Sequence, residues 1–142
     1  MKKFLLTFIV PLLFFVGLLI TFQTQTAPGF GNLFLGILGS LAVLAGLGLW
    51  VWGFLSLGKS FAVLPKAKEL KTKGAYKFFR HPIYIGIALS CLGISLGMGS
   101  LPGILFTFLI IIPLNIFRAK KEEKELEKKF GKDYLEYKSK VR

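Results

Sequence analysis

Two short groups of residues have the types and spacing needed to bind a small charged ligand. In the first, Arg80 and His81 stand directly before Pro82. Proline favours the first turn of a helix, so the sequence predicts that a helix begins at Pro82. The free N–H groups at such a start attract anions, and Arg80 adds a positive charge beside them. This segment could hold a carboxylate, although membrane topology alone would also favour basic residues before a helix start.

The second group follows a long apolar run and contains Arg118, Glu122 and Glu123. On a helix, both glutamates share a face with Leu126 and Phe130, so they lie on the apolar stripe rather than opposite it. A carboxylate on a buried stripe close to a membrane is costly unless it has a partner. Ribose hydroxyls or an ammonium group would be suitable partners. A lattice of ion pairs within the helix is the simpler alternative.

Long apolar runs must position these two groups, and they predict an all-α membrane protein. Of the 142 residues, 54% are hydrophobic, and the runs 4–22, 30–58 and 83–117 contain no charged side chain. A helix needs roughly 20 mostly apolar residues to cross a bilayer. A turn-like stretch at 97–103 divides the third run. We therefore expect about four transmembrane helices, the last two forming a hairpin, and a cytoplasmic C-terminal helix.

The chain is expected to form one domain, residues 1–142, with two N-terminal spans in 1–58 and a cofactor-binding core in 59–142. Gly131 interrupts the C-terminal apolar stripe and predicts a bend there. Small residues allow membrane helices to approach closely. We assign this packing role to seven positions: Gly36, Gly39, Ala42, Gly46, Gly48, Gly93 and Gly97.

Charge placement predicts the orientation. The net charge is +12, and the 19 Lys and Arg residues fall as two at the N-terminus, seven in 59–80 and ten from Arg118 onward. The positive-inside rule then places both termini and the 59–80 loop in the cytoplasm, at the plasma membrane if the organism is prokaryotic. A cleaved signal peptide is the alternative for the first run, but its apolar part exceeds the roughly 15 residues of such a signal. Basic residues beside spans favour membrane lipids over nucleic acid as partners.

The chain contains one cysteine, Cys91, and one histidine, His81. A single cysteine excludes an intramolecular disulfide. With only one histidine as well, the sequence predicts no metal site. We interpret Cys91 as a small buried side chain.

Both candidate groups stand at the cytoplasmic ends of the predicted hairpin, so a cationic helix start and a carboxylate pair should lie together. A zwitterionic ligand with a sugar and an apolar base matches this arrangement, and S-adenosylmethionine has those parts. Aromatic faces could contact its cation and its base. Four side chains could supply them: Phe61, Tyr76, Phe79 and Tyr84.

The same residues also resemble a known family. The motifs are Gly74-Ala75-Tyr76, Arg80-His81-Pro82-Ile83-Tyr84-Ile85-Gly86 and Glu122-Glu123-x-x-Leu126, followed by Phe130-Gly131, Tyr134, Tyr137, Val141 and Arg142. They look like those of the isoprenylcysteine carboxyl methyltransferase and phospholipid methyltransferase superfamily. The resemblance covers about half of the chain, from roughly Leu64 to the end. It implies a pocket for S-adenosylmethionine that is lined by Lys68, Glu69, Leu70, Lys71, Tyr76, Arg80, His81, Pro82, Ile83, Tyr84, Glu122 and Glu123.

The resemblance also implies that Arg118 faces the acceptor, and we predict catalytic roles for Arg118 and His81. A carboxylate acceptor would need only a cation such as Arg118 to place it, whereas an amine must first lose a proton, to His81 or Glu123. Lys68 stands where prenylcysteine enzymes often carry a histidine, and Ala75 replaces a common proline. The acceptor therefore stays open between a prenylcysteine-type carboxylate and a phospholipid-type amine.

Two other classes remain open. A sterol-type membrane reductase shares a similar hairpin and C-terminal helix, but it would bind NADPH, whose diphosphate calls for more arginine than these segments offer. A non-catalytic membrane adaptor would bind no cofactor. We favour an integral-membrane methyltransferase that uses S-adenosylmethionine and acts on a lipophilic or lipid-anchored acceptor entering from the bilayer.

Overall fold

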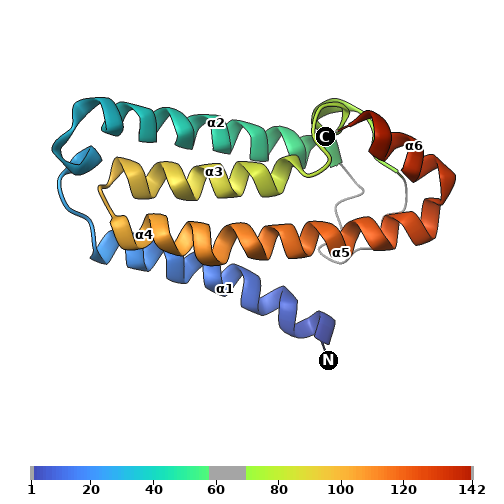
Figure 1. Ribbon diagram of the computed structural model, residues 1–142, viewed down its shortest axis with the longest axis horizontal. Coiled ribbons are helices and arrows are strands. Elements are labelled where there is room, and N and C mark those ends of the chain that lie inside the picture. Colours follow the sequence, from blue (N-terminus) through green and yellow to red (C-terminus); the bar gives the residue numbers. More distant parts are fainter. Residues whose placement is uncertain (1, 58–69, 142) are drawn as a thin grey trace.

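The computed structural model describes residues 2–57 and 70–141, and within these ranges the chain forms helices and short connections with no strand (Figure 1). The all-α prediction is confirmed. The α-helices are α1 (Lys2–Gln23), α2 (Leu33–Leu57), α3 (Pro82–Gly97), α4 (Leu101–Phe106), α5 (Ile112–Phe130) and α6 (Lys132–Lys140). Short helical turns are η1 (Pro28–Gly31), η3 (Gly74–Lys77) and η4 (Thr107–Ile111), the last of them a π turn that joins α4 to α5.

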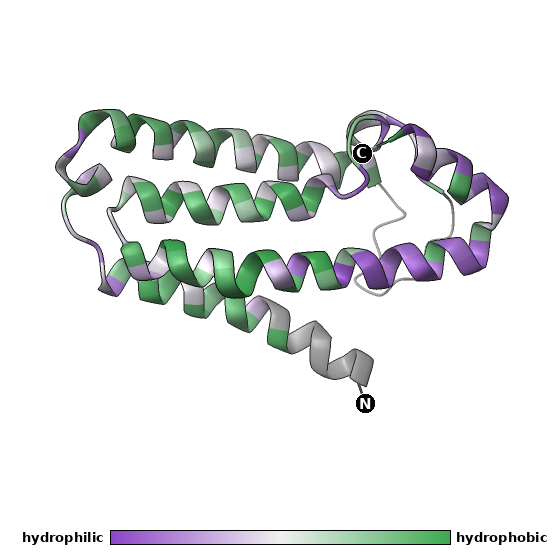
Figure 2. Cartoon of the chain, viewed as in Figure 1, coloured by the Kyte–Doolittle hydropathy of each residue, from purple (hydrophilic) through white to green (hydrophobic). Residues whose placement is uncertain are grey.

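Three helical stretches are apolar and long enough to cross a membrane, by length and composition: Pro11–Gly31, Leu33–Leu57 and Leu101–Phe130. Helix α3 is also apolar, but it has 16 residues, fewer than the roughly 20 that a span requires. Figure 2 shows hydrophobic residues along α2, α3 and α4, and hydrophilic residues in the second half of α5 and in α6. The described part of the chain therefore contains three long apolar helices and one short apolar helix.

The predicted hairpin is present, since α3 and α4 follow one another through a tight turn and α3 also contacts α5 (Figure 1). Ser100 caps α4, because its Oγ accepts a hydrogen bond from the N–H of Gly103 at 3.0 Å. At the same end, the hydroxyls of Thr24 and Ser100 lie 2.7 Å apart. This hydrogen bond ties α1 to the turn of the hairpin, as polar side chains often do between membrane helices.

Glycines make the contact between α2 and α3 possible. Gly39, Gly46 and Gly53 repeat every seven residues on α2 and are all buried, because that spacing keeps residues on one face of a helix. A Cβ atom added at Gly86 would lie 2.6 Å from the carbonyl oxygen of Gly46, and one at Gly93 would lie 2.7 Å from that of Gly39. The two backbones therefore touch, and the predicted close approach is confirmed at these positions.

The prediction was wrong at Gly48, where no atom lies within 4 Å of an added Cβ. Gly46 and Gly48 thus form a matched pair on one helix. We expect Gly46→Ala to lower the free energy of unfolding by about 1–3 kcal/mol, because the added methyl overlaps Ser90 and the Gly86 carbonyl oxygen. Gly48→Ala should be neutral or stabilising by up to about 1 kcal/mol, since alanine is the better helix former.

Thermal unfolding of both variants in the same detergent measures this difference. Equal unfolding temperatures for the two variants would contradict the backbone contact between α2 and α3.

Candidate active site

The two sequence motifs meet at one end of the helices, where α3 begins and α5 becomes hydrophilic (Figures 1 and 2). Gly131 adopts a φ of +53° and separates α5 from α6, so the predicted bend is confirmed. Beyond the bend, α6 turns back toward η3 and the start of α3 (Figure 1). The candidate site is therefore built from η3, the first turn of α3, the hydrophilic half of α5, and α6.

Glu123 lies at the centre of an ion cluster that joins three of these segments. Its Oε1 accepts a hydrogen bond from Nη1 of Arg80 at 2.8 Å and lies 3.1 Å from Nε2 of His81. Its Oε2 lies 3.0 Å from Nζ of Lys138 on α6. The Glu123 side chain is 15% exposed. The carboxylate on the buried stripe thus has basic partners within the protein, as its position requires.

Glu122, the neighbouring carboxylate, is in a different environment. Its side chain is 41% exposed. Its Oε2 accepts a hydrogen bond from the hydroxyl of Tyr84 at 3.2 Å and lies 3.8 Å from Nδ1 of His81. A carboxylate has about four lone-pair positions for hydrogen bonds. Glu122 therefore keeps capacity to accept bonds from a ligand, whereas Glu123 is committed to the ion cluster.

Aromatic and cationic side chains surround the Tyr84 ring. The guanidinium of Arg118 lies 5.2 Å from the ring centroid, within the range of a cation–π contact. The His81 ring stacks on Tyr84 with a centroid distance of 5.7 Å. Tyr84 thus connects the helix start, Glu122 and Arg118, which the sequence predicted to lie together.

The segment η3 is fixed against both α2 and α6. Ala75 is fully buried, and its N–H donates a hydrogen bond to Oγ of Ser56 at 3.1 Å. The carbonyl oxygen of Tyr76 accepts a 2.6 Å bond from the hydroxyl of Tyr137. Burial, followed by the charge of Glu122, raises the pKa of Tyr76 above its ordinary value, and burial raises the pKa of Tyr137 to about 12. Both phenols therefore stay protonated near neutral pH and can donate hydrogen bonds.

Helix α3 begins at Pro82, as predicted, with His81 at the N-cap position. No side chain among the described residues caps this end by a hydrogen bond. Helix α2 packs against the same turn, because a Cβ at Gly53 would lie 3.1 Å from Cγ of Pro82 and 3.3 Å from N of Ile83. The start of α3 is therefore held in place by α2 and keeps N–H groups that are free of side-chain caps.

The structure brings together most of the predicted site residues, namely Tyr76, Arg80, His81, Pro82, Ile83, Tyr84, Arg118, Glu122 and Glu123. It differs from the expectation in one respect, because the charge of Arg80 is directed to Glu123 and not left free beside the helix start. Leu70 and Lys71 stand at the edge of the described segment. Phe61, Lys68 and Glu69 lie outside the described residues.

Sequence analysis missed two residues that contact the site. Lys138 completes the ion cluster, and Asn115 is buried and donates a hydrogen bond to the carbonyl oxygen of Tyr84. Asn115 had a signal in the sequence, because it is an amide within an otherwise uncharged apolar run, where polar side chains are expensive. Lys138 had none, since one lysine among many on α6 is not distinguished by pattern.

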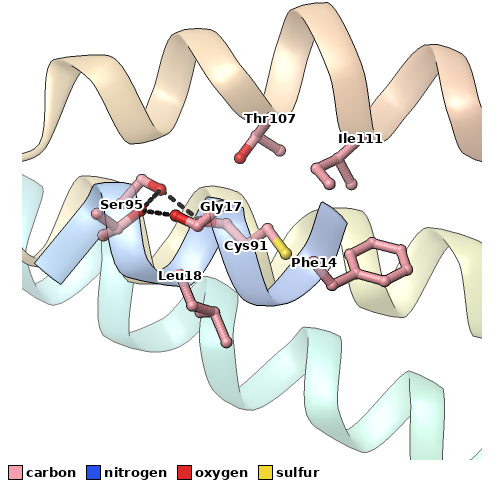
Figure 3. A pocket seen from close by; sticks show the side chains of 8 residues that line it. Phe14, Gly17, Leu18, Cys91, Ser95, Thr107 and Ile111 are labelled. Carbon is pink, nitrogen blue, oxygen red and sulfur yellow. Dashed lines mark hydrogen bonds between the residues drawn. The ribbon is translucent and has the colours of Figure 1, made fainter. Parts of the chain in front are cut away.

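A small cavity lies elsewhere, between α1, α3 and the π turn (Figure 3). Two of its hydroxyl groups, on Thr21 and Ser95, are 3.1 Å apart and hydrogen-bond to each other. It is lined by Phe14, Gly17, Leu18, Thr21, Cys91, Ser95, Thr107 and Ile111. None of these is a predicted ligand-binding residue, so the cavity is separate from the candidate site. No cluster of three metal-ligating side chains occurs among the described residues.

The ion cluster can be tested through stability. We expect Glu123→Gln to lower the free energy of unfolding by about 1.5–3 kcal/mol, because charged hydrogen bonds to partly buried basic groups are lost. Glu136→Gln is the matched control, since Glu136 pairs with Lys140 on the exposed surface of α6, where ion pairs contribute little. Thermal unfolding in detergent distinguishes them. A Glu123 variant as stable as the Glu136 variant would show that the cluster does not hold the site together.

A comparison with protein families bears on these motifs. A family model described as phospholipid methyltransferase matches residues 34–133, from α2 to the start of α6. No curated protein and no solved structure matches the chain significantly. The matched range contains η3, the start of α3 and both glutamates. Together with the apolar helices, the match indicates an integral membrane protein. The chain therefore belongs to the phospholipid methyltransferase family, which confirms the resemblance of its motifs.

Proposed function

We propose that this chain uses S-adenosylmethionine to methylate a lipophilic acceptor at the membrane surface. Family membership already implies a methyltransferase. S-adenosylmethionine as the methyl donor is supported by one observation. The start of α3, which no described side chain caps, lies beside Tyr84 and Glu122. This meeting occurs where the apolar helices become hydrophilic (Figure 2). A water-soluble cofactor and a lipid-soluble acceptor can both reach such a place.

The residues present fit S-adenosylmethionine. Its carboxylate matches the free N–H groups and the positive dipole end at the start of α3. Its ribose hydroxyls match Glu122, which is partly exposed and holds one hydrogen bond from Tyr84. The ring of Tyr76 offers a face for the adenine or the sulfonium, whereas the ring of Tyr84 already contacts His81 and Arg118. When bound, the cofactor supplies an electrophilic methyl group, and the protein has to align an acceptor with it.

Arg118 and His81 have different tasks in this proposal. Arg118 is half-buried over the ring of Tyr84, and it would place the polar end of the acceptor. His81 is hydrogen-bonded to Glu123, and it would accept the proton that an amine acceptor must lose. A carboxylate acceptor has no proton to lose and would need Arg118 alone.

Exposed apolar side chains beside the site support a lipophilic acceptor. Phe78 and Phe79 follow η3 directly and are exposed, as are Ile116 and Phe117, which precede Arg118. The description of the matched family favours a phospholipid-type amine. A prenylcysteine-type carboxylate is the second candidate, because the guanidinium of Arg118, which lies over the Tyr84 ring, could pair with it.

We further propose four spans with both termini and the 59–80 loop in the cytoplasm. The distribution of Lys and Arg supports this orientation. The beginning of α1 and the C-terminus also lie at the same end of the molecule (Figure 1). In this arrangement α3, which rises about 24 Å, crosses most of the apolar layer.

Glu122→Gln tests the cofactor site. We expect the variant to bind S-adenosylmethionine about 10- to 100-fold more weakly, because a hydrogen bond to a charged group contributes roughly 1.5–3 kcal/mol. Calorimetry on the purified protein in detergent measures the affinity. Glu125→Gln, three residues along the same helix, is the control and should bind as the unmodified protein does. Unchanged affinity in Glu122→Gln would mean that Glu122 belongs only to the surface lattice.

Arg118→Ala tests the acceptor side. Turnover should fall about 10- to 100-fold, whereas the affinity for S-adenosylmethionine should change little, because the proposed contact of Arg118 is with the acceptor. Lys120→Ala, an exposed basic residue two positions further, serves as the control. A parallel loss of cofactor affinity would place Arg118 in the cofactor pocket instead.

A further inference from the structure

A buried amide lies one turn before Arg118 in α5. Asn115 is 5% exposed. Before it, residues 101–114 are apolar except for Thr107, and after it come Ile116 and Phe117. Polar side chains at such a depth are rare and usually serve a function or a helix contact. The contacts of Asn115 show which of its atoms is used within the protein.

Only one end of the amide has a partner. Nδ2 of Asn115 donates a hydrogen bond to the backbone carbonyl oxygen of Tyr84 at 3.2 Å. Since a carbonyl can only accept, this bond fixes which end is nitrogen. Oδ1 is buried, and no described residue donates a hydrogen bond to it. A buried acceptor without a donor destabilises the protein, so the oxygen needs a donor from outside the described fold.

Asn115 belongs to the same helix face as the proposed site. Residues three and seven positions later on a helix share its face, and these are Arg118 and Glu122. Tyr84 contacts both ends of this face, because its hydroxyl bonds Glu122 and its carbonyl oxygen bonds Asn115. Asn115 therefore extends the site toward the bilayer, by about 4.5 Å along the helix from Arg118.

The π turn explains why this face points to the protein interior. Buried residues occur every four positions, at Gly103, Thr107, Ile111 and Asn115. In a regular α-helix, a spacing of four drifts about 40° per step. The carbonyl of Thr107 bonds the N–H of Ile112, five residues on, which widens the turn and offsets that drift. Such π turns are frequent at functional sites.

We propose that Oδ1 of Asn115 accepts a hydrogen bond from an N–H group of the methyl acceptor, and that Asn115 thereby selects amines over carboxylates. The inference rests on the proposed function. A carboxylate that is ready for methylation has no hydrogen to donate, and its lone pairs would repel the amide oxygen. A primary amine on a lipid head group, in its neutral and reactive form, donates two N–H groups. A dimethylated amine in the same form donates none.

This difference gives a sharp test with the purified full-length protein. Two acceptors are compared, a phospholipid with a primary amine and its N,N-dimethyl analogue. We expect Asn115→Leu to lower kcat/KM about tenfold for the primary amine and less than twofold for the dimethyl analogue. The affinity for S-adenosylmethionine should change less than the kcat/KM for the primary amine, because Asn115 meets the cofactor site only through the backbone carbonyl oxygen of Tyr84.

Asn115→Asp is the conservative variant. Burial in an apolar segment favours the neutral carboxyl, which keeps an acceptor oxygen and can donate its O–H to the carbonyl oxygen of Tyr84, so this variant should retain at least half of the kcat/KM for the primary amine. Equal losses on both acceptors in Asn115→Leu, or a loss in Asn115→Asp as large as in Asn115→Leu, would overturn the inference. If Asn115→Leu does not fold, Asn115→Asp decides the question. The ratio of kcat/KM for the primary amine to kcat/KM for the dimethyl analogue should then stay within threefold of the ratio in the unmodified protein, and a larger change would contradict the role.

The role of Asn115 and the proposed methyltransferase function would be contradicted by different results. If the unmodified protein methylates a carboxylate acceptor in preference to both amines, the role of Asn115 is wrong and the proposed function stands. If it transfers no methyl group from S-adenosylmethionine to any acceptor, the proposed function fails and the inference fails with it.

Discussion

The arrangement of the site depends on one carboxylate, Glu123, and the three basic side chains that it holds. Arg80 and His81 come from the entry to α3, and Lys138 comes from α6. Without Glu123, these basic groups would lose the carboxylate that all three share, and Arg80 would remain partly buried without its ion-pair partner, which is unfavourable. The ion cluster therefore fixes the start of α3, the hydrophilic half of α5 and α6 in one geometry. Among the described residues Glu122, the neighbour of Glu123 in sequence, holds only the Tyr84 hydroxyl and a longer contact with His81, so it keeps acceptor positions for a ligand.

The rest of the fold positions this cluster at the end of the apolar helices where α5 becomes hydrophilic (Figure 2). The backbone contact between α2 and α3 places the start of α3 against the end of α2, and Ser56 at that end holds η3 through Ala75. The hydrophilic half of α5 begins where its apolar half ends (Figure 2). The site thus lies at the boundary between apolar and hydrophilic residues, which suits the soluble methyl donor and the lipid acceptor that we propose.

The sequence predicted the features that follow from local chemistry. The helix start at Pro82 and the bend at Gly131 follow from proline and glycine, and the meeting of the α3 start with the glutamate pair follows from the predicted hairpin. The pairing of Glu123 with both Arg80 and Lys138 could not be predicted, because it depends on the angle at which α6 returns. The open space at Gly48 and the π turn before Asn115 depend on tertiary packing, which single-sequence patterns do not determine.

The central claim is that the protein transfers a methyl group from S-adenosylmethionine to a lipid. The most direct test incubates the purified protein with S-adenosylmethionine labelled in its methyl group and with total membrane lipid, then extracts the lipids. We expect label to accumulate in the lipid fraction in proportion to the amount of protein, and to be absent from that fraction when the protein is omitted. Label that stays wholly in the aqueous phase at every protein concentration would contradict the account.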